Sequence, residues 1–155
     1  MSILKDTTLE SNKYLKINFD GGDLSSDAGL LLIKEFACKL GFVKLLKSEF
    51  KTNDTASFRY HKDDENLWQV IYQILGAYFE DDCADELTKD PILTAILVKK
   101  ALASQPTLSR FFNRMDEDSL NQFYTLMRRF RKVVYSIKKP EIILLDLDST
   151  LLNTY

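Results

Sequence analysis

The chain has 155 residues, of which 45% are hydrophobic and 12% aromatic. This is enough apolar side chain for about one folded domain, and it excludes intrinsic disorder over most of the length. No apolar stretch approaches the roughly 20 residues that a membrane span needs, so no membrane partner is expected. Two cysteines and a single histidine argue against a disulfide framework, a zinc site or a Ser-His-Asp triad, and they favour a cytoplasmic location.

The charge is strongly polarised along the chain. The net charge is only -2, yet the segment 99–139 holds ten basic and three acidic residues, a local charge of +7. The segments on either side are both acidic. A chain of this kind can present one basic face to phosphate while remaining acidic as a whole. The alternative interpretation is a solvated helical surface without a ligand.

The first half of the chain predicts one short strand followed by helices. Leu15, Ile17 and Phe19 alternate with polar residues, which is typical of a half-buried strand. Helical spacing of apolar residues follows over about 25–40, with Gly41 placed to end that helix and a second short helix after it. Residues 51–65 are polar and predict a loop. An amphipathic helix is expected from about 67 to 78, and an acidic connection over 80–86.

The second half predicts three further helices. Asp90-Pro91 is a helix start with a capping carboxylate, and Ser104 to Thr107 begins a short helix. A long amphipathic helix runs from about 118 to 137 and places Leu120, Phe123, Tyr124, Met127, Phe130, Val134 and Ile137 on one side. Pro140 ends it.

The last segment is different in kind. Residues 141–148 form a continuous apolar run that ends in Asp146 and Asp148, which predicts a buried strand of an α/β sheet. Two such carboxylates point to the same face about 7 Å apart. At an effective dielectric constant near 20 they repel by roughly 2 kcal/mol, so a divalent cation or a raised pKa is expected. The alternative is a solvated strand end. A buried strand also needs neighbours in a sheet, so we expect a truncated chain.

Two enzyme classes place carboxylates in this way. The Asp-x-Asp-x-Thr pattern resembles the opening motif of haloacid-dehalogenase-like phosphatases, in which Asp146 would be the nucleophile and Asp148 the general acid/base, with magnesium bound. It also resembles the first strand of RNase H-like nucleases and transposases of the DDE type. The local motif does not decide between these alternatives.

Four segments together, over about 20–155, resemble bacterial insertion-sequence transposases with a group 1 DDE domain. They occur in the family's order: 19–32, 90–93, 102–111 and 145–150. The third reads LASQPTLSRF and is a close match, although Phe112 stands where the family usually has Glu. The resemblance implies that Asp148 is the first catalytic Asp and a Mg²⁺ ligand, and that Asp146 supports the metal electrostatically.

The resemblance also implies an organisation and a set of partners. The expected fold is mostly α: an arm or strand over 1–19, a helical DNA-binding and association region over 20–139, and the first strand of a truncated RNase H-like domain over 140–155. The expected partners are double-stranded DNA at transposon ends and a second copy of the chain, in a bacterial cytoplasm. A chain that lacks the remaining carboxylates is expected to be inactive alone. A non-catalytic helical DNA-binding regulator is the further alternative.

The candidate DNA contacts lie in the basic segment. Polar residues surround the start of the short helix, where free N–H groups suit phosphate or base edges, and basic residues line the long helix. Each group has an alternative interpretation without DNA. The polar residues over 104–107 would also be expected of an ordinary helix cap and turn, and the basic residues over 128–132 of the solvated face of an amphipathic helix. The candidates are Gln105, Thr107, Ser109, Arg110, Asn113, Arg114, Arg128, Arg129, Arg131 and Lys132.

Overall fold

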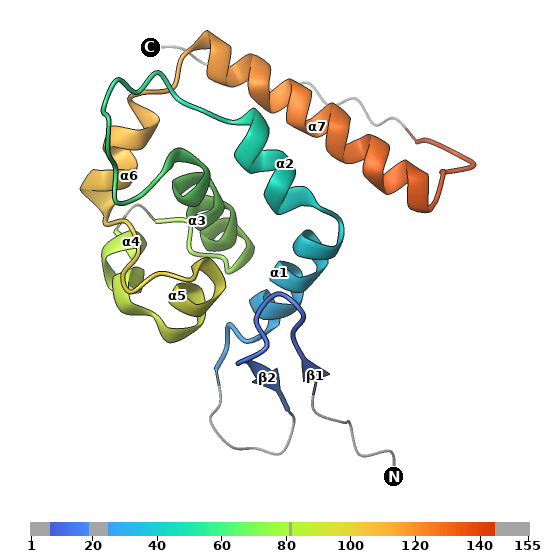
Figure 1. Ribbon diagram of the computed structural model, residues 1–155, viewed down its shortest axis with the longest axis horizontal. Helices are drawn as coiled ribbons and strands as arrows, with labels where there is room; N and C mark the ends of the chain where they lie inside the picture. The colour runs from blue at the N-terminus through green and yellow to red at the C-terminus, as the bar shows by residue number, and fades with distance from the viewer. Residues whose placement is uncertain (1–6, 19–24, 81, 145–155) are drawn as a thin grey trace.

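A computed structural model describes residues 7–18, 25–80 and 82–144, and these residues form a mostly helical structure with one small hairpin (Figure 1). None of the described helices is long and apolar enough to cross a membrane. In chain order the elements are β1 (Thr7–Thr8), β2 (Lys16–Ile17), α1 (Gly29–Lys39), α2 (Phe42–Glu49), α3 (Asp63–Leu75), α4 (Cys83–Glu86), a 3₁₀ turn (Leu87–Lys89), α5 (Pro91–Leu97), α6 (Gln105–Phe112) and α7 (Glu117–Ile137).

The N-terminal strand is confirmed, and it pairs with a partner that was not predicted. β1 and β2 are antiparallel, with Thr7 opposite Ile17. A strand of two residues leaves no periodic signal that would reveal it in the sequence. Between the two strands Leu9 is only 1% exposed and belongs to the main core, and the N–H of Ser11 donates to Glu35 in α1 at 2.8 Å. The hairpin and the helices therefore share one core.

The first two helices follow the predicted pattern with one shift. Gly41 has φ of 70° and forms the left-handed break between α1 and α2. α1 begins only at Gly29, after a turn over 26–28, and no side chain caps it. The carboxylate of Asp27 instead accepts a hydrogen bond from the hydroxyl of Tyr78 at 2.7 Å. That hydrogen bond, with some burial, raises the pKa of Tyr78 to about 12.

α3 crosses the centre of the molecule and carries much of the core. It begins at Asp63, earlier than predicted, because the carboxylate of Glu65 accepts from the N–H of Lys62 and satisfies one donor at the helix start. Trp68 and Tyr72 stack with ring centroids 5.5 Å apart, and the Tyr72 side chain is completely buried. The acidic connection after α3 contains the short helix α4.

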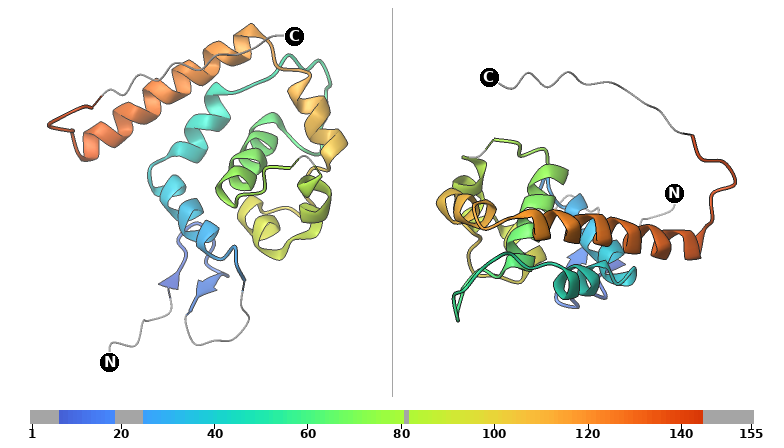
Figure 2. Two further views of the ribbon diagram at one scale, coloured as in Figure 1. Left: turned by 180° about the vertical axis from the view of Figure 1, so that it is seen from behind. Right: turned by 90° about the horizontal axis from the view of Figure 1, so that it is seen from above.

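α7 lies along one edge of the molecule and packs mainly on α2 (Figures 1 and 2). Phe130 meets Phe42 at 4.3 Å and Phe123 meets Phe50 at 5.1 Å between ring centroids. The carboxylate of Asp116 accepts from the N–H of Ser119 and caps the first turn. The predicted apolar side divides into two: one part packs on α2, and the other, described below, is exposed.

The strand predicted over 141–148 is not present in its described part. Residues 141–144 form no strand, and Ile142, Ile143 and Leu144 are exposed. A strand requires an edge to pair with, and the only sheet among the described residues is the hairpin, which lies at the bottom of the view in Figure 1, whereas the segment after α7 lies at the right. The rest of the predicted strand lies outside the described residues, and with it the expected start of an RNase H-like domain.

Candidate nucleic-acid interface

The start of α6 is closed by the chain's own groups. The N–H of Gln105 donates to the carboxylate of Asp85 at 2.9 Å, and the N–H groups of Thr107 and Leu108 donate to the carbonyl of Ser104 at 2.9 and 3.0 Å. Pro106, also in the first turn, has no N–H. The expectation of free N–H groups at this helix start is therefore wrong, because a carboxylate from α4 occupies the position where a phosphate would bind.

The side chains of α6 point in three directions. Leu108 and Phe111 are buried against the body. On one flank Gln105, Ser109 and Asn113 line a cleft of about 340 Å³ against the end of α3. On the other flank the hydroxyl of Thr107 lies 3.2 Å from that of Ser104. Arg110 is exposed on the same flank, with its guanidinium 3.5 Å from the hydroxyl of Thr107.

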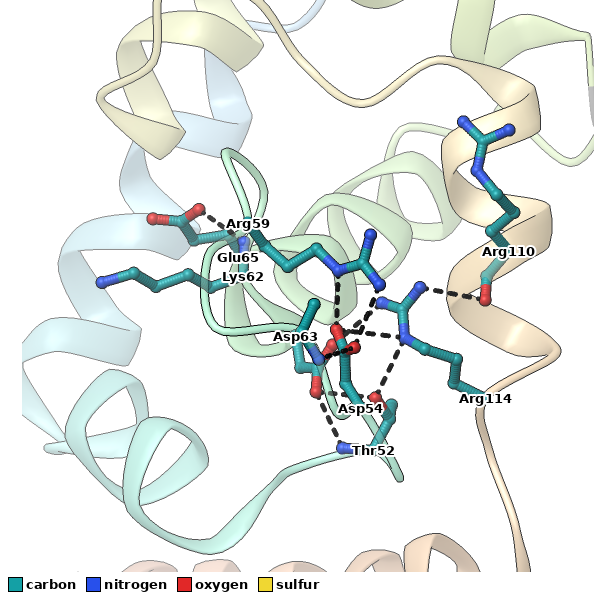
Figure 3. Close-up of polar contacts among 9 residues, drawn as sticks. Thr52, Asp54, Arg59, Lys62, Asp63, Glu65, Arg110 and Arg114 are labelled. Atoms are coloured by element: carbon teal, nitrogen blue, oxygen red, sulfur yellow. Dashed lines mark hydrogen bonds and ion pairs between the residues drawn. The ribbon is translucent and has the colours of Figure 1, made fainter.

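Arg114 belongs to an ion-pair cluster that fixes the loop 51–62. Its guanidinium lies 3.1 Å from Asp63 and 3.5 Å from Asp54, and it donates to the hydroxyl of Thr52 at 3.3 Å. Arg59 binds the same Asp54 at 2.8 Å. In Figure 3 these side chains converge, whereas the Arg110 guanidinium points away from them. The Arg114 side chain is only 18% exposed, and its charge is compensated by the carboxylates of Asp54 and Asp63.

The cluster predicts how stability depends on pH. The hydrogen bond from Arg59, the N–H of Ala56 and the nearby charge of Arg114 hold the pKa of Asp54 well below its usual value of 3.8, against a smaller opposing effect of burial. A carboxylate with a lowered folded pKa stabilises the fold above its unfolded pKa, and this contribution is lost as pH falls toward the folded pKa. In urea titrations from about pH 5 to about pH 2, we expect the free energy of unfolding to fall less steeply for Asp54→Asn than for wild type.

Glu141→Gln is the matched control for this titration, because Glu141 is exposed and makes no ion pair with any described residue. It should keep the wild-type slope. An Asp54→Asn chain that keeps the wild-type slope as well would show that this carboxylate does not contribute to acid unfolding.

The basic residues of α7 are in two different situations. Arg129 is paired with Glu49 of α2 at 2.8 Å. Arg128, Arg131 and Lys132 are exposed and have no carboxylate at ion-pair distance among the residues described. Arg128 and Lys132 are four residues apart and follow one line on the outer surface of the helix. We call this pair the outer ridge.

Sequence reasoning missed the residues that decide which cations are available. Asp54 and Asp63 engage Arg114, Glu49 engages Arg129, and Asp85 closes the start of α6. The separations in sequence range from about 20 to 80 residues, and a polar loop or an acidic run gives no sign of such a partner.

Comparison with known families decides the identity. The model of the family described as transposase DDE domain, group 1, matches residues 7–155. The chain belongs to that family. Neither the search of curated proteins nor the search of solved structures gave a match.

Members of this transposase family typically use a divalent metal. Within residues 7–18, 25–80 and 82–144 no group of three His, Cys, Asp or Glu side chains could hold such an ion. Asp146 and Asp148, the two candidate ligands, lie outside the described residues.

Proposed function

We propose that the helical region of this DDE transposase chain binds double-stranded DNA, at transposon ends, through its exposed cations. The observation that carries the proposal is the outer ridge on α7, where Arg128 and Lys132 are exposed and unpaired among the described residues. Arg110 on α6 and Arg131 on α7 are the further exposed contacts. Gln105, Ser109 and Asn113, in the cleft beside α6, are placed to add polar contacts, and Thr107 a weaker one.

Two of the sequence candidates have a smaller part in this proposal. Arg114 and Arg129 are each held by carboxylates of the chain itself. A cation that is already compensated releases fewer counterions from DNA, so it adds less to affinity. Four unpaired cations remain for phosphate: Arg110, Arg128, Arg131 and Lys132.

Salt dependence tests this proposal directly. With four phosphate contacts, the logarithm of the association constant should fall against the logarithm of salt concentration with a slope near -3.6, at about 0.9 per contact. Fluorescence anisotropy with a labelled duplex, between about 50 and about 200 mM salt, measures that slope. Binding that does not change with salt, or no binding at the lowest salt, would contradict the proposal.

We also propose that Asp148 is the first catalytic carboxylate, that Asp146 supports it, and that both serve a Mg²⁺ site. The family membership supports this choice over the phosphatase interpretation of the same motif. A two-metal displacement at phosphorus needs ligands that hold the ions from several sides, and one strand end supplies only part of such a set. The chain alone should therefore nick supercoiled plasmid in Mg²⁺ no faster than its Asp148→Asn variant, and faster nicking would show a complete site.

A non-catalytic regulatory role is a second candidate. The specific observation in its favour is that the described residues form a packed helical body with exposed cations, which supports DNA binding without catalysis. Competition of this chain with a complete transposase of the family for the same DNA distinguishes this role from an inert fragment.

A further inference from the structure

α7 has an apolar stripe that no described residue covers. Leu120 is 51% exposed, Tyr124 63%, Met127 60% and Val134 38%. Leu120, Met127 and Val134 are spaced by seven residues, so they lie on one line of the helix, as the core positions of a helix pair do. The residues that pack on α2, such as Phe123 and Phe130, lie on a neighbouring line. We call the exposed line, together with Tyr124, the α7 stripe.

The charges of α7 are sorted along its length. Glu117, with Asp116 and Asp118, makes the N-terminal end acidic, and Lys138 follows the last turn with Lys139. A second line of the helix, next to the stripe, reads Glu117, Tyr124 and Arg131 at intervals of seven, and Lys138, seven residues further on, is the residue that ends the helix. Arg131 and Lys138 make no ion pair with any described residue. An acidic end, an aromatic ring and two cations thus flank the exposed apolar residues in a fixed order.

We propose that the α7 stripe binds the α7 stripe of a second copy of this chain, with the two helices antiparallel. The sequence is self-complementary only in that direction. With the two-fold axis at Met127, Leu120 of one copy meets Val134 of the other, because each is seven residues from the axis. On the flanking line Glu117 and Lys138 are ten and eleven residues from the axis, and Tyr124 and Arg131 are three and four residues from it. Each pair is therefore offset by one residue, about 1.5 Å along the helix, which side chains of this length span, and each pair occurs twice by symmetry.

A parallel pair would not bring these residues together. Its two-fold axis runs along the helices, so the flanking line of one copy would face the opposite flank of the other, the side on which Phe123 and Phe130 pack against α2 and its end. The antiparallel pair instead forms two Glu–Lys ion pairs and two contacts of Arg131 with an aromatic ring, which attracts a cation over its face. The flanking charges therefore fit a second copy of the chain in the antiparallel direction.

The interface is one helix long, which sets its strength. Twenty-one residues span about 31 Å, so the contact lies at the small end of specific interfaces and the dimer should be reversible, with Kd of about 10–100 µM. The inference does not rest on the DNA-binding proposal. Arg128 and Lys132 lie on a different line of α7, so they remain accessible in the dimer. Arg131, which faces Tyr124 of the other copy in the dimer, is the one cation that both proposals use.

Analytical ultracentrifugation of the full chain tests the stripe. Met127→Lys places two positive charges together at the two-fold axis, and we expect it to weaken dimerisation at least tenfold. Asn121→Lys is the matched control, because it adds the same charge to an exposed position of the same helix away from the stripe. It should leave dimerisation within twofold of wild type. Far-UV circular dichroism of both variants establishes that they are folded.

Charge exchange and cross-linking test the direction. Glu117→Lys should weaken the dimer several-fold, because Lys then faces Lys138 of the other copy, and adding Lys138→Glu in the same chain should restore it. A mixture of Leu120→Cys and Val134→Cys chains should form a disulfide between positions 120 and 134, identified by mass spectrometry apart from Cys38 and Cys83. Cross-linking of 120 to 120 in the Leu120→Cys chain alone would overturn the antiparallel arrangement.

Three results would overturn the inference as a whole. The first is a wild-type chain that stays monomeric up to several hundred micromolar. The second is a dimer that Met127→Lys and Asn121→Lys affect equally. The third is a monomer that Met127→Lys destabilises toward unfolding, which would mean that another segment of the same chain covers the stripe. None of these results depends on DNA, so loss of DNA binding and loss of the dimer are read separately.

Discussion

Replacing Arg128 and Lys132 together by Gln is expected to weaken binding to duplex DNA by about 10- to 100-fold near 0.1 M salt. These two side chains form the outer ridge, and they are exposed cations without a carboxylate partner among the described residues. Each phosphate contact contributes about 0.9 to the salt slope, so the double variant should also lower the magnitude of the slope by about 1.8. Anisotropy titrations of the wild type and the variant at several salt concentrations measure both quantities.

Arg129→Gln is the matched comparison on the same helix. It removes a charge of the same kind, but that charge is paired with Glu49 at 2.8 Å. Exposed pairs of this type contribute little to stability, so the variant stays folded, and we expect its DNA affinity to fall by less than threefold. Equal losses for Arg129→Gln and for either single ridge variant would mean that net charge, and not the ridge, determines binding.

Replacing Gln69 by Leu is expected to destabilise the chain by about 2–5 kcal/mol. The Gln69 amide forms both of its hydrogen bonds with one residue: Nε2 donates to the carbonyl of Ala103 at 2.7 Å, and Oε1 accepts from the N–H of Ala103 at 2.8 Å. Gln69 is 2% exposed and Ala103 is fully buried. Leu would leave two buried backbone groups without partners, each costing about 1–3 kcal/mol, and urea unfolding followed by circular dichroism measures the loss.

Gln122→Leu is the control for that experiment. Gln122 also accepts a hydrogen bond from a backbone N–H, that of Lys51 at 2.7 Å, but the bond is exposed and water can replace it. We expect a loss below about 1 kcal/mol. A similarly small loss for Gln69→Leu would show that water reaches Ala103 when the amide is removed.

The position of Gln69 explains what the LASQPTLSRF segment does in the fold. Leu102, Ala103, Leu108 and Phe111 of that segment are all buried, and Gln69 fixes its start against α3. Much of the segment by which the sequence resembles its family therefore serves packing. Its exposed residues, Ser109 and Arg110 among them, are the ones available to a ligand.

The sequence by itself determined the elements whose signals are local. Gly41 breaks α1 from α2 with a left-handed backbone, and the carboxylate of Asp90 caps α5, where Pro91 follows. The long helix begins and ends within a residue or so of the prediction, because Asp116 caps it and its apolar spacing continues to Ile137. In each case the residues that decide the structure are within a few positions of one another.

Only the tertiary structure decided which of the cations are available. Arg110 and Arg114 are four residues apart, yet one is exposed and the other is held by Asp54 and Asp63. Arg128 and Arg129 are adjacent, yet only Arg129 meets Glu49. The electrostatic state of a cation depends on the carboxylates within a few ångströms, and here those carboxylates come from segments 51 to 80 residues away, which only the packing of α2, α3 and α7 brings into contact.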